Sequence, residues 1–192
     1  MIVSHKHKFI YLATKKTGTT SFQKKFGKYN ECKLKKHSTL SMLNFDYCDY
    51  FIFCFVRNPW DRLVSGYMQC QKPVNLKDSY RKYIYKLSNS HPFSDFLKIA
   101  DDNFWEDFDQ SRFYLNKGKL IDFVGRFENL SSEVKMVCNK LNIEYVNLPH
   151  KNKSKHKHYT EYYDDEAREI VAEKYAKDIE YFGYEFGGLT NE

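Results

Sequence analysis

Residues 14–21, TKKTGTTS, combine lysines, a glycine and a run of hydroxyl side chains in one short stretch. The aromatic and aliphatic segment before them, residues 9–13, predicts a short buried strand, and residues 22–26 can begin a helix. Backbone N–H groups and the positive dipole end meet at a helix N-terminus, where they favour anions. We therefore expect a phosphate-binding loop whose contact residues are Lys16, Thr17, Gly18, Thr19, Thr20 and Ser21.

Each residue type in this loop has a separate task. Gly18 lets the backbone approach an anion closely, Lys16 can place a point charge on a bridging oxygen, and the hydroxyls can donate to the other oxygens. The loop is not a Walker A loop, because its lysine precedes the glycine. That order argues against an ordinary ATP or GTP hydrolase. The plain alternative is a basic turn in which a Thr or Ser caps the helix.

A second strand-to-helix junction follows residues 51–56, six consecutive apolar residues with the pattern of a central parallel strand. Asn58 is a suitable N-cap and Pro59 suits the first helical position, so a helix begins directly after Arg57. Ligands of open α/β sheets bind at such strand ends, where Arg57 can make a bidentate contact to phosphate. Ser65 lies further along the same helix. A salt bridge of Arg57 to a neighbouring carboxylate is the structural alternative.

Together these stretches resemble the sulfotransferases, and within them the carbohydrate-type branch. KFIYLATKKTGTTS resembles a motif that usually runs like IPKTGGTS, and FCFVRNPWDRLVSGY resembles FVRNPWDRLVS, with the family's spacing from Arg57 to Ser65. DFVGRFENL and the stretch LPHKNKSKHKHYTEYYDDE with KDIEYFGYEF are similar to later motifs, so the likeness touches the beginning, middle and end of the chain. The first motif keeps Lys-Thr-Gly but departs from the usual residues at Ala13, Thr14, Lys15 and Thr19.

The resemblance implies a fold and a sulfuryl donor. The fold is α/β, a P-loop-like three-layer arrangement with a central parallel sheet flanked by helices, and residues 1–192 form a single domain. The donor is 3′-phosphoadenosine 5′-phosphosulfate (PAPS). The candidate residues themselves do not require a metal ion. By the same resemblance Lys16 through Ser21 hold the 5′-phosphosulfate, while Arg57 and Ser65 hold the 3′-phosphate.

The later motifs add three further candidate binding residues: Arg126, Lys153 and Ser154. Arg126 is expected near the end of a third buried strand, residues 120–127, and the resemblance implies that it helps to bind the nucleotide; pairing with Glu128 is the structural alternative. The basic loop at residues 149–159 resembles a late loop that closes over the nucleotide. Lys153 and Ser154 are expected near one of the anionic groups. A solvated surface loop is the plain interpretation of the same composition.

An in-line transfer to an acceptor hydroxyl benefits from a general base. His37 is the best candidate, because it lies between the two phosphate motifs, where the resemblance implies a catalytic histidine, and neutral imidazole accepts a proton near pH 7. A surface histidine within KKHST is the alternative interpretation. His91, Glu128 and Asp61 are weaker candidates for the base.

The remaining segments predict supporting structure. Residues 1–7 read as a basic lead-in, and residues 68–118 as a mostly helical insertion in which Trp105 can stack on a sugar or belong to the core. Residues 130–141 predict an amphipathic helix, whose apolar face is formed by Leu130, Val134, Val137, Cys138 and Leu141. Residues 163–179 predict a last helix.

Composition bounds the class of protein. The chain has 192 residues, 42% of them hydrophobic, and a formal net charge of +6, which suits an anionic ligand. Its five cysteines include no CxxC pair, so free thiols in a reducing compartment are expected. No stretch is apolar enough for a signal peptide or a membrane span, which predicts a cytoplasmic protein. A trimmed form of a membrane-tethered parent remains open.

The acceptor implied by the resemblance is a carbohydrate, or another molecule that bears a hydroxyl. Two other functions stay open. One is a P-loop-type kinase that uses Mg²⁺ with a nucleotide, although no strand ends in an obvious metal-binding Asp. The other is a non-catalytic basic module that binds a polyanion, although no nucleic-acid-binding motif is present.

Overall fold

The computed structural model describes residues 1–73, 78–145, 147–148 and 157–188. The chain divides into two compact units, which are described separately. The first comprises residues 1–57, 110–153 and 191–192, and the second comprises residues 58–109 and 154–190. The single domain expected for the whole chain therefore stays a prediction.

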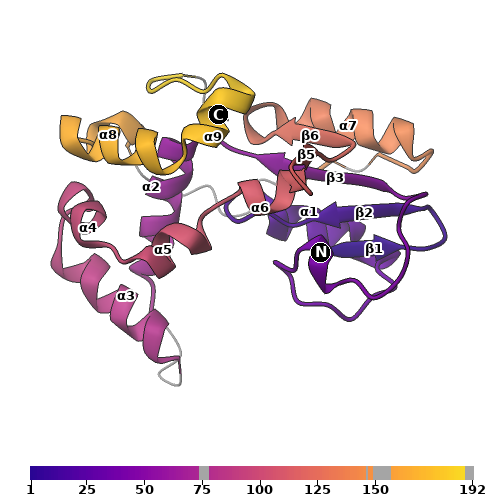
Figure 1. Ribbon diagram of the computed structural model, residues 1–192, viewed down its shortest axis with the longest axis horizontal. Helices are drawn as coiled ribbons and strands as arrows, with labels where there is room; N and C mark the ends of the chain where they lie inside the picture. Colours follow the sequence, from indigo (N-terminus) through magenta and orange to yellow (C-terminus); the bar gives the residue numbers. More distant parts are fainter. Residues whose placement is uncertain (74–77, 146, 149–156, 189–192) are drawn as a thin grey trace. The chain divides into compact units, whose positions relative to one another are not determined.

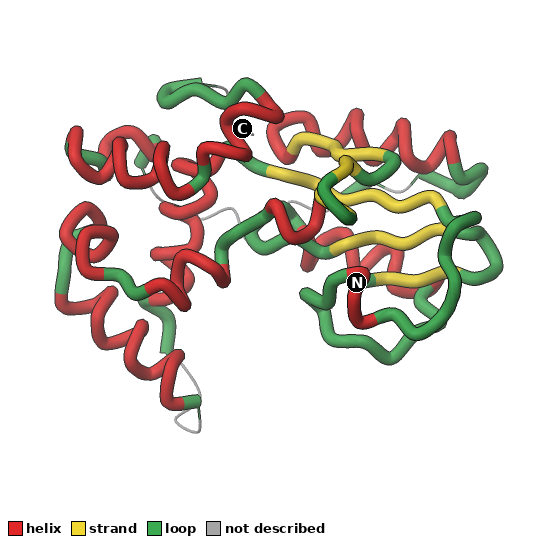
Figure 2. Tube along the Cα trace, in the orientation of Figure 1, coloured by secondary structure: helices red, strands yellow, loops and turns green. Residues whose placement is uncertain are grey.

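The first unit is built on a four-stranded sheet in the order β1-β2-β3-β6 (Figures 1 and 2). Its strands are β1 (Ile2–Ser4), β2 (Phe9–Leu12), β3 (Phe51–Val56) and β6 (Phe123–Arg126). The strands β2, β3 and β6 run parallel, whereas β1 pairs with β2 antiparallel. The expected α/β class with a central sheet flanked by helices is therefore confirmed, but the sheet is mostly rather than wholly parallel because of β1.

Two strand predictions were wrong. Residues 1–7 are not only a lead-in, because they contain β1 with Ile2 and Val3 fully buried; a three-residue edge strand is too short to show a period. The third strand, expected to be buried from Leu120, begins only at Phe123, and of its residues only Gly125 is buried. Instead β5 (Lys119–Leu120) pairs with β4 (Leu115–Asn116), and the left-handed Lys117 and Gly118 form the tight turn between them.

One face of the sheet carries an aromatic core. Phe9, Tyr11, Phe53 and Phe55 alternate onto the face that packs against α1 (Thr19–Phe26) and α7 (Leu130–Lys140). From the helices come Phe22, Phe26, Leu130, Val134, Val137 and Cys138, so the amphipathic helix expected at residues 130–141 is confirmed. The residues of β2 and β3 that point to the other face are buried too, as expected for a central strand. The short helix α6 (Ser111–Tyr114) packs against β3.

Three single-turn 3-10 helices complete the described secondary structure of the first unit: η1 (Gly27–Tyr29), η2 (Leu40–Met42) and η3 (Phe127–Asn129).

The second unit is helical. Its helices are α2 (Pro59–Cys70), α3 (Ser79–Ser90), α4 (Phe93–Ile99), α5 (Asp102–Asp107), η4 (Tyr159–Tyr162), α8 (Asp165–Lys174) and α9 (Ala176–Phe182). The last helix expected at residues 163–179 is in fact two helices. The break is at Tyr175, whose backbone is non-helical and whose hydroxyl donates to the Trp105 carbonyl at 3.1 Å. In the part of the chain that the structure describes, no helix has the length and apolarity to cross a membrane.

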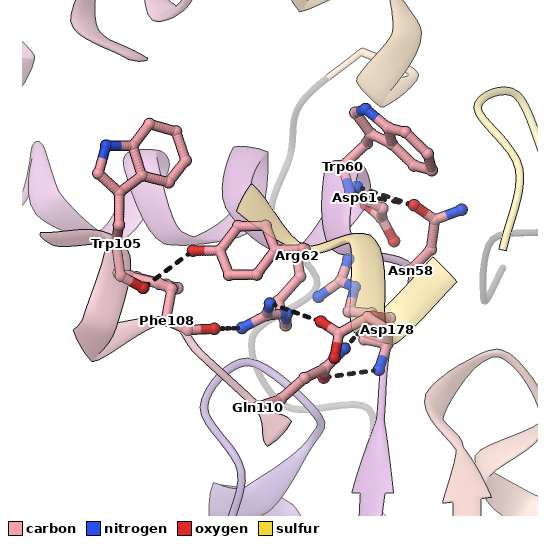
Figure 3. A network of polar contacts seen from close by, with 10 residues as sticks. Asn58, Trp60, Asp61, Arg62, Trp105, Phe108, Gln110 and Asp178 are labelled. Atoms are coloured by element: carbon pink, nitrogen blue, oxygen red, sulfur yellow. Dashed lines mark hydrogen bonds and ion pairs between the residues drawn. The ribbon is translucent and has the colours of Figure 1, made fainter. Parts of the chain in front are cut away.

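An arginine lies in the core of the second unit (Figure 3). Arg62 of α2 is completely buried; its guanidinium donates to the Phe108 carbonyl and lies 3.5 Å from Asp178 Oδ2 on α9. The Tyr175 ring centre is 5.0 Å from the guanidinium carbon. The sequence had given Arg62 no special role, but the structure makes it the ionic link between α2 and α9.

Candidate functional site

The loop after β2 turns through two left-handed residues. Lys16 has φ 65° and Gly18 has φ 71°, and Gly18 is the N-cap of α1. A Cβ atom added to Gly18 would lie 2.8 Å from the Leu130 side chain and 3.3 Å from the Phe127 ring. Glycine is therefore required both by the backbone conformation and by close packing of the loop on η3 and α7.

The loop hydroxyls divide into an inner and an outer set. Thr17 and Thr19 are buried, and their hydroxyls donate to the Thr14 carbonyl at 3.0 and 2.6 Å. Both hydroxyl protons are therefore used in hydrogen bonds within the loop. An anion bound here would rely instead on the backbone N–H groups at the start of α1. Thr20 is exposed on the outer side, and Ser21 is buried.

Arg57 is the first residue after β3, and the structure brings it to the loop. Its Nη1 donates to the Lys16 carbonyl at 3.0 Å, and its guanidinium carbon lies 4.5 Å from the centre of the Phe127 ring. Gln110 clamps the Arg57 backbone: the Arg57 N–H donates to Oε1 at 3.2 Å, and Nε2 donates to the Arg57 carbonyl at 3.0 Å. Gln110 is fully buried, and no motif in the sequence had indicated it.

Arg126 is the last residue of β6, where it pairs with Val56, so it lies at the same sheet edge as Arg57. Its side chain is exposed, and its backbone N–H donates to Glu133 at 3.5 Å. The carboxyl ends of β2, β3 and β6 thus present the loop, Arg57 and Arg126 in succession.

His37 is attached to the strand end that precedes the loop. Its Nδ1 lies 2.5 Å from the Ala13 carbonyl oxygen, and since a carbonyl only accepts, Nδ1 carries the proton. Burial, together with the smaller effect of the positive charges of Lys15 and Lys36, lowers the pKa of His37 to about 4. The imidazole is therefore neutral at pH 7 and has its lone pair on Nε2, the state required of a base.

The other expected ligands are not brought to this edge by the described contacts. Ser65 is buried in α2 of the second unit, so its approach to the site of Arg57 stays a prediction. Lys153 and Ser154 lie outside the described residues. Of the weaker candidates for the base, His91 ends α3, and its Nδ1 lies 3.1 Å from the Leu87 carbonyl.

No group of three or more His, Cys, Asp or Glu side chains is placed to hold a metal ion within the described ranges of the chain.

Fold and site together define an α/β protein with a lysine-containing loop where three parallel strands end. The chain belongs to the sulfotransferase family, whose sequence pattern matches residues 1–185. It is also 32% identical over 100 residues to an uncharacterized protein of Archaeoglobus fulgidus, a stretch that covers 49% of this chain and 69% of that one. No solved structure matches the chain.

The His37 environment predicts how stability depends on pH. The pKa is about 4 in the folded protein against an ordinary 6.5, so the unfolded chain binds more protons between these values and stability falls as the pH is lowered through this range. Since His37 is only half-buried, we expect about 1 kcal/mol, or about 2–4 °C in Tm, between pH 7 and pH 5. His37→Gln, which keeps a donor to Ala13 but does not titrate, should lose less stability over this interval. Parallel melting curves for the two proteins would contradict the burial of the ring.

Proposed function

We propose that the protein transfers a sulfuryl group from PAPS to a hydroxyl of a carbohydrate acceptor. The observation that carries this proposal is the contact of Arg57 with the Lys16 carbonyl, which joins two cationic residues from the ends of neighbouring parallel strands. A donor with phosphate groups at both its 3′ and 5′ positions needs two such anion sites close together. An ordinary nucleoside triphosphate needs no cation for a 3′ group.

The residues around the loop fit an anionic donor. Lys15 and Lys16 precede α1, and the first turn of that helix contains no acidic side chain. The positive end of the helix dipole is thus joined by positive side chains, an arrangement that suits a phosphosulfate. Lys16 and the backbone of residues 17–21 would hold the 5′ group, while Arg57 and Ser65 would hold the 3′-phosphate.

In this reaction PAPS supplies the sulfuryl group, and the acceptor oxygen replaces the phosphate oxygen on sulfur. Lys16 would stabilise the negative charge that grows on the departing oxygen, an interaction stronger in the transition state than in the ground state. His37 would take the acceptor proton at Nε2, because Nδ1 is engaged by Ala13. The arriving anion would offset the charges of Lys15 and Lys36 and so raise the low pKa of this base.

The choice of a carbohydrate acceptor rests on the likeness of both phosphate motifs to the carbohydrate-type branch. Arg126, at the edge shared with Arg57, is proposed to bind the nucleotide, and Lys153 and Ser154 to close over it. We further propose that the sheet and its loop form a P-loop-like nucleotide site that works without a metal ion.

Calorimetric titration with two nucleotides tests the donor. Adenosine 3′,5′-bisphosphate should bind the wild-type protein at least tenfold more tightly than adenosine 5′-phosphate, which lacks the 3′ group. Arg57→Ala should weaken the bisphosphate by about 10–100-fold, since a charge-assisted bond to phosphate contributes about 1.5–3 kcal/mol. The same variant should weaken the binding of adenosine 5′-phosphate less than that of the bisphosphate, because adenosine 5′-phosphate lacks the 3′ group and loses only the support that Arg57 gives to the Lys16 carbonyl.

Arg112→Ala is the matched control, because Arg112 is an exposed arginine on α6. Equal binding of the two nucleotides, or none of either, would refute the PAPS assignment. ATP with Mg²⁺ as the preferred ligand would favour the kinase alternative. Binding that falls steeply with salt and survives Lys16→Ala would favour the polyanion module.

A further inference from the structure

We propose that Lys36 is an additional anion-binding residue, which contacts the 5′ phosphosulfate from outside the loop. This inference rests on the proposed function and adds a residue to its site. Lys36 Nζ donates to the Thr20 hydroxyl at 2.8 Å, and Thr20 is the second residue of α1. An ammonium group from a segment 16 residues away in sequence therefore lies at the helix end where the anion would bind.

A tight turn presents this side chain together with His37. The Ser38 N–H donates to the Lys35 carbonyl at 3.2 Å, so Lys36 and His37 are the two central residues of the turn. Ser38 and Leu40 are buried and anchor the segment that follows. From this turn Lys36 reaches the start of α1, while His37 reaches Ala13 at the end of β2. One short segment thus supplies both a cation for the donor and the candidate base for the acceptor.

The position of Lys36 is electrostatically unfavourable without a ligand. A cation near a helix N-terminus is repelled by the helix dipole, and Lys15 and Lys16 add like charges in the same loop. Partial burial lowers the pKa of the Lys36 ammonium, and no acidic residue occupies the first turn of α1. A single hydrogen bond to an exposed Thr20 hydroxyl offsets little of this repulsion. A bound anion would attract the ammonium of Lys36, the other lysines and the helix N-terminus, and so offset their mutual repulsion. The arrangement is therefore better suited to binding than to stability.

The test uses three ligands and a neighbouring lysine as control. Adenosine 3′,5′-bisphosphate, adenosine 5′-phosphate and adenosine 3′-phosphate are titrated into wild type, Lys36→Ala, Lys36→Arg and Lys35→Ala. Lys35 is exposed and lies in the same turn, so its loss changes the net charge equally. Lys36→Ala should weaken both ligands that carry a 5′-phosphate by about tenfold and should leave adenosine 3′-phosphate unchanged. Lys36→Arg should stay within threefold of wild type, and Lys35→Ala within twofold.

Thermal melting without ligand shows whether each variant is folded. If wild type binds the bisphosphate and Lys36→Ala binds it no more weakly than Lys35→Ala does, the role of Lys36 is refuted while the proposed function stands. Equal weakening of all three ligands by Lys36→Ala also refutes it, because that result indicates a general distortion of the site. Failure of the wild type to bind the bisphosphate refutes the proposed function itself.

Discussion

Lys16→Ala is expected to lower kcat for sulfuryl transfer by about 10²–10³-fold, the usual cost of removing one donor that stabilises transition-state charge. Binding of adenosine 3′,5′-bisphosphate should weaken far less, by about tenfold, because the lysine acts most strongly on the oxygen that leaves. The measurements are the rate of sulfuryl transfer from PAPS at a saturating donor concentration and the calorimetric affinity for adenosine 3′,5′-bisphosphate.

The structure indicates that Lys16→Ala removes the side-chain charge and keeps the backbone conformation of the loop. Arg57 binds the carbonyl of residue 16, a backbone atom that alanine retains. Alanine also has a Cβ, so the left-handed φ of 65° is no easier for it than for lysine, and the loop conformation should persist. Lys15→Ala is the matched control, a neighbouring lysine whose removal changes the charge equally, and it should lose less than tenfold. A Lys16→Ala protein with kcat within threefold of wild type would exclude Lys16 from the chemistry.

Asp178→Ala is expected to destabilise the second unit by about 3–5 kcal/mol, because it leaves the guanidinium of Arg62 buried without its counter-ion. The two side chains are 0% and 2% exposed, so water cannot replace the lost partner. Urea unfolding followed by far-ultraviolet circular dichroism measures the change. Glu180→Ala, an exposed carboxylate on the same helix, should change stability by less than about 0.5 kcal/mol.

A double variant separates the charge from the packing. Arg62→Met with Asp178→Leu removes both ions and fills their space with apolar atoms, so it should recover most of the stability lost in Asp178→Ala. If Asp178→Ala alone unfolds like the wild type, Arg62 has sufficient partners without the carboxylate. In that case its role as the ionic link between α2 and α9 would be wrong.

The local features of the site could be predicted from the sequence. Six apolar residues, then Asn58 and Pro59, specify β3, its end and the start of α2, because burial, capping and the fixed φ of proline act over a few residues. The loop at residues 14–21 could be located for the same reason. Its glycine, lysine and strand-to-helix setting are local, and the family match over residues 1–185 agrees with that interpretation.

Other features were decided only in three dimensions. Thr17 and Thr19 looked like phosphate donors, yet they brace the Thr14 carbonyl. Gln110 holds the Arg57 backbone from 53 residues away, and nothing in either local pattern indicates that pairing. Arg62 is buried, although in its motif only neighbouring residues had been given a predicted role.

By itself, then, the sequence determined the strand and the helix on either side of the loop, the positions of Lys16 and Arg57 at two strand ends, and the family. Only the tertiary structure decided which side chains meet. It places Lys36 against Thr20, His37 against Ala13 and Arg57 against the Lys16 carbonyl. The physical reason is distance along the chain: caps, turns and periodicity act within a few residues, whereas these contacts join segments 16 to 41 residues apart, and the packing of the sheet brings those segments together.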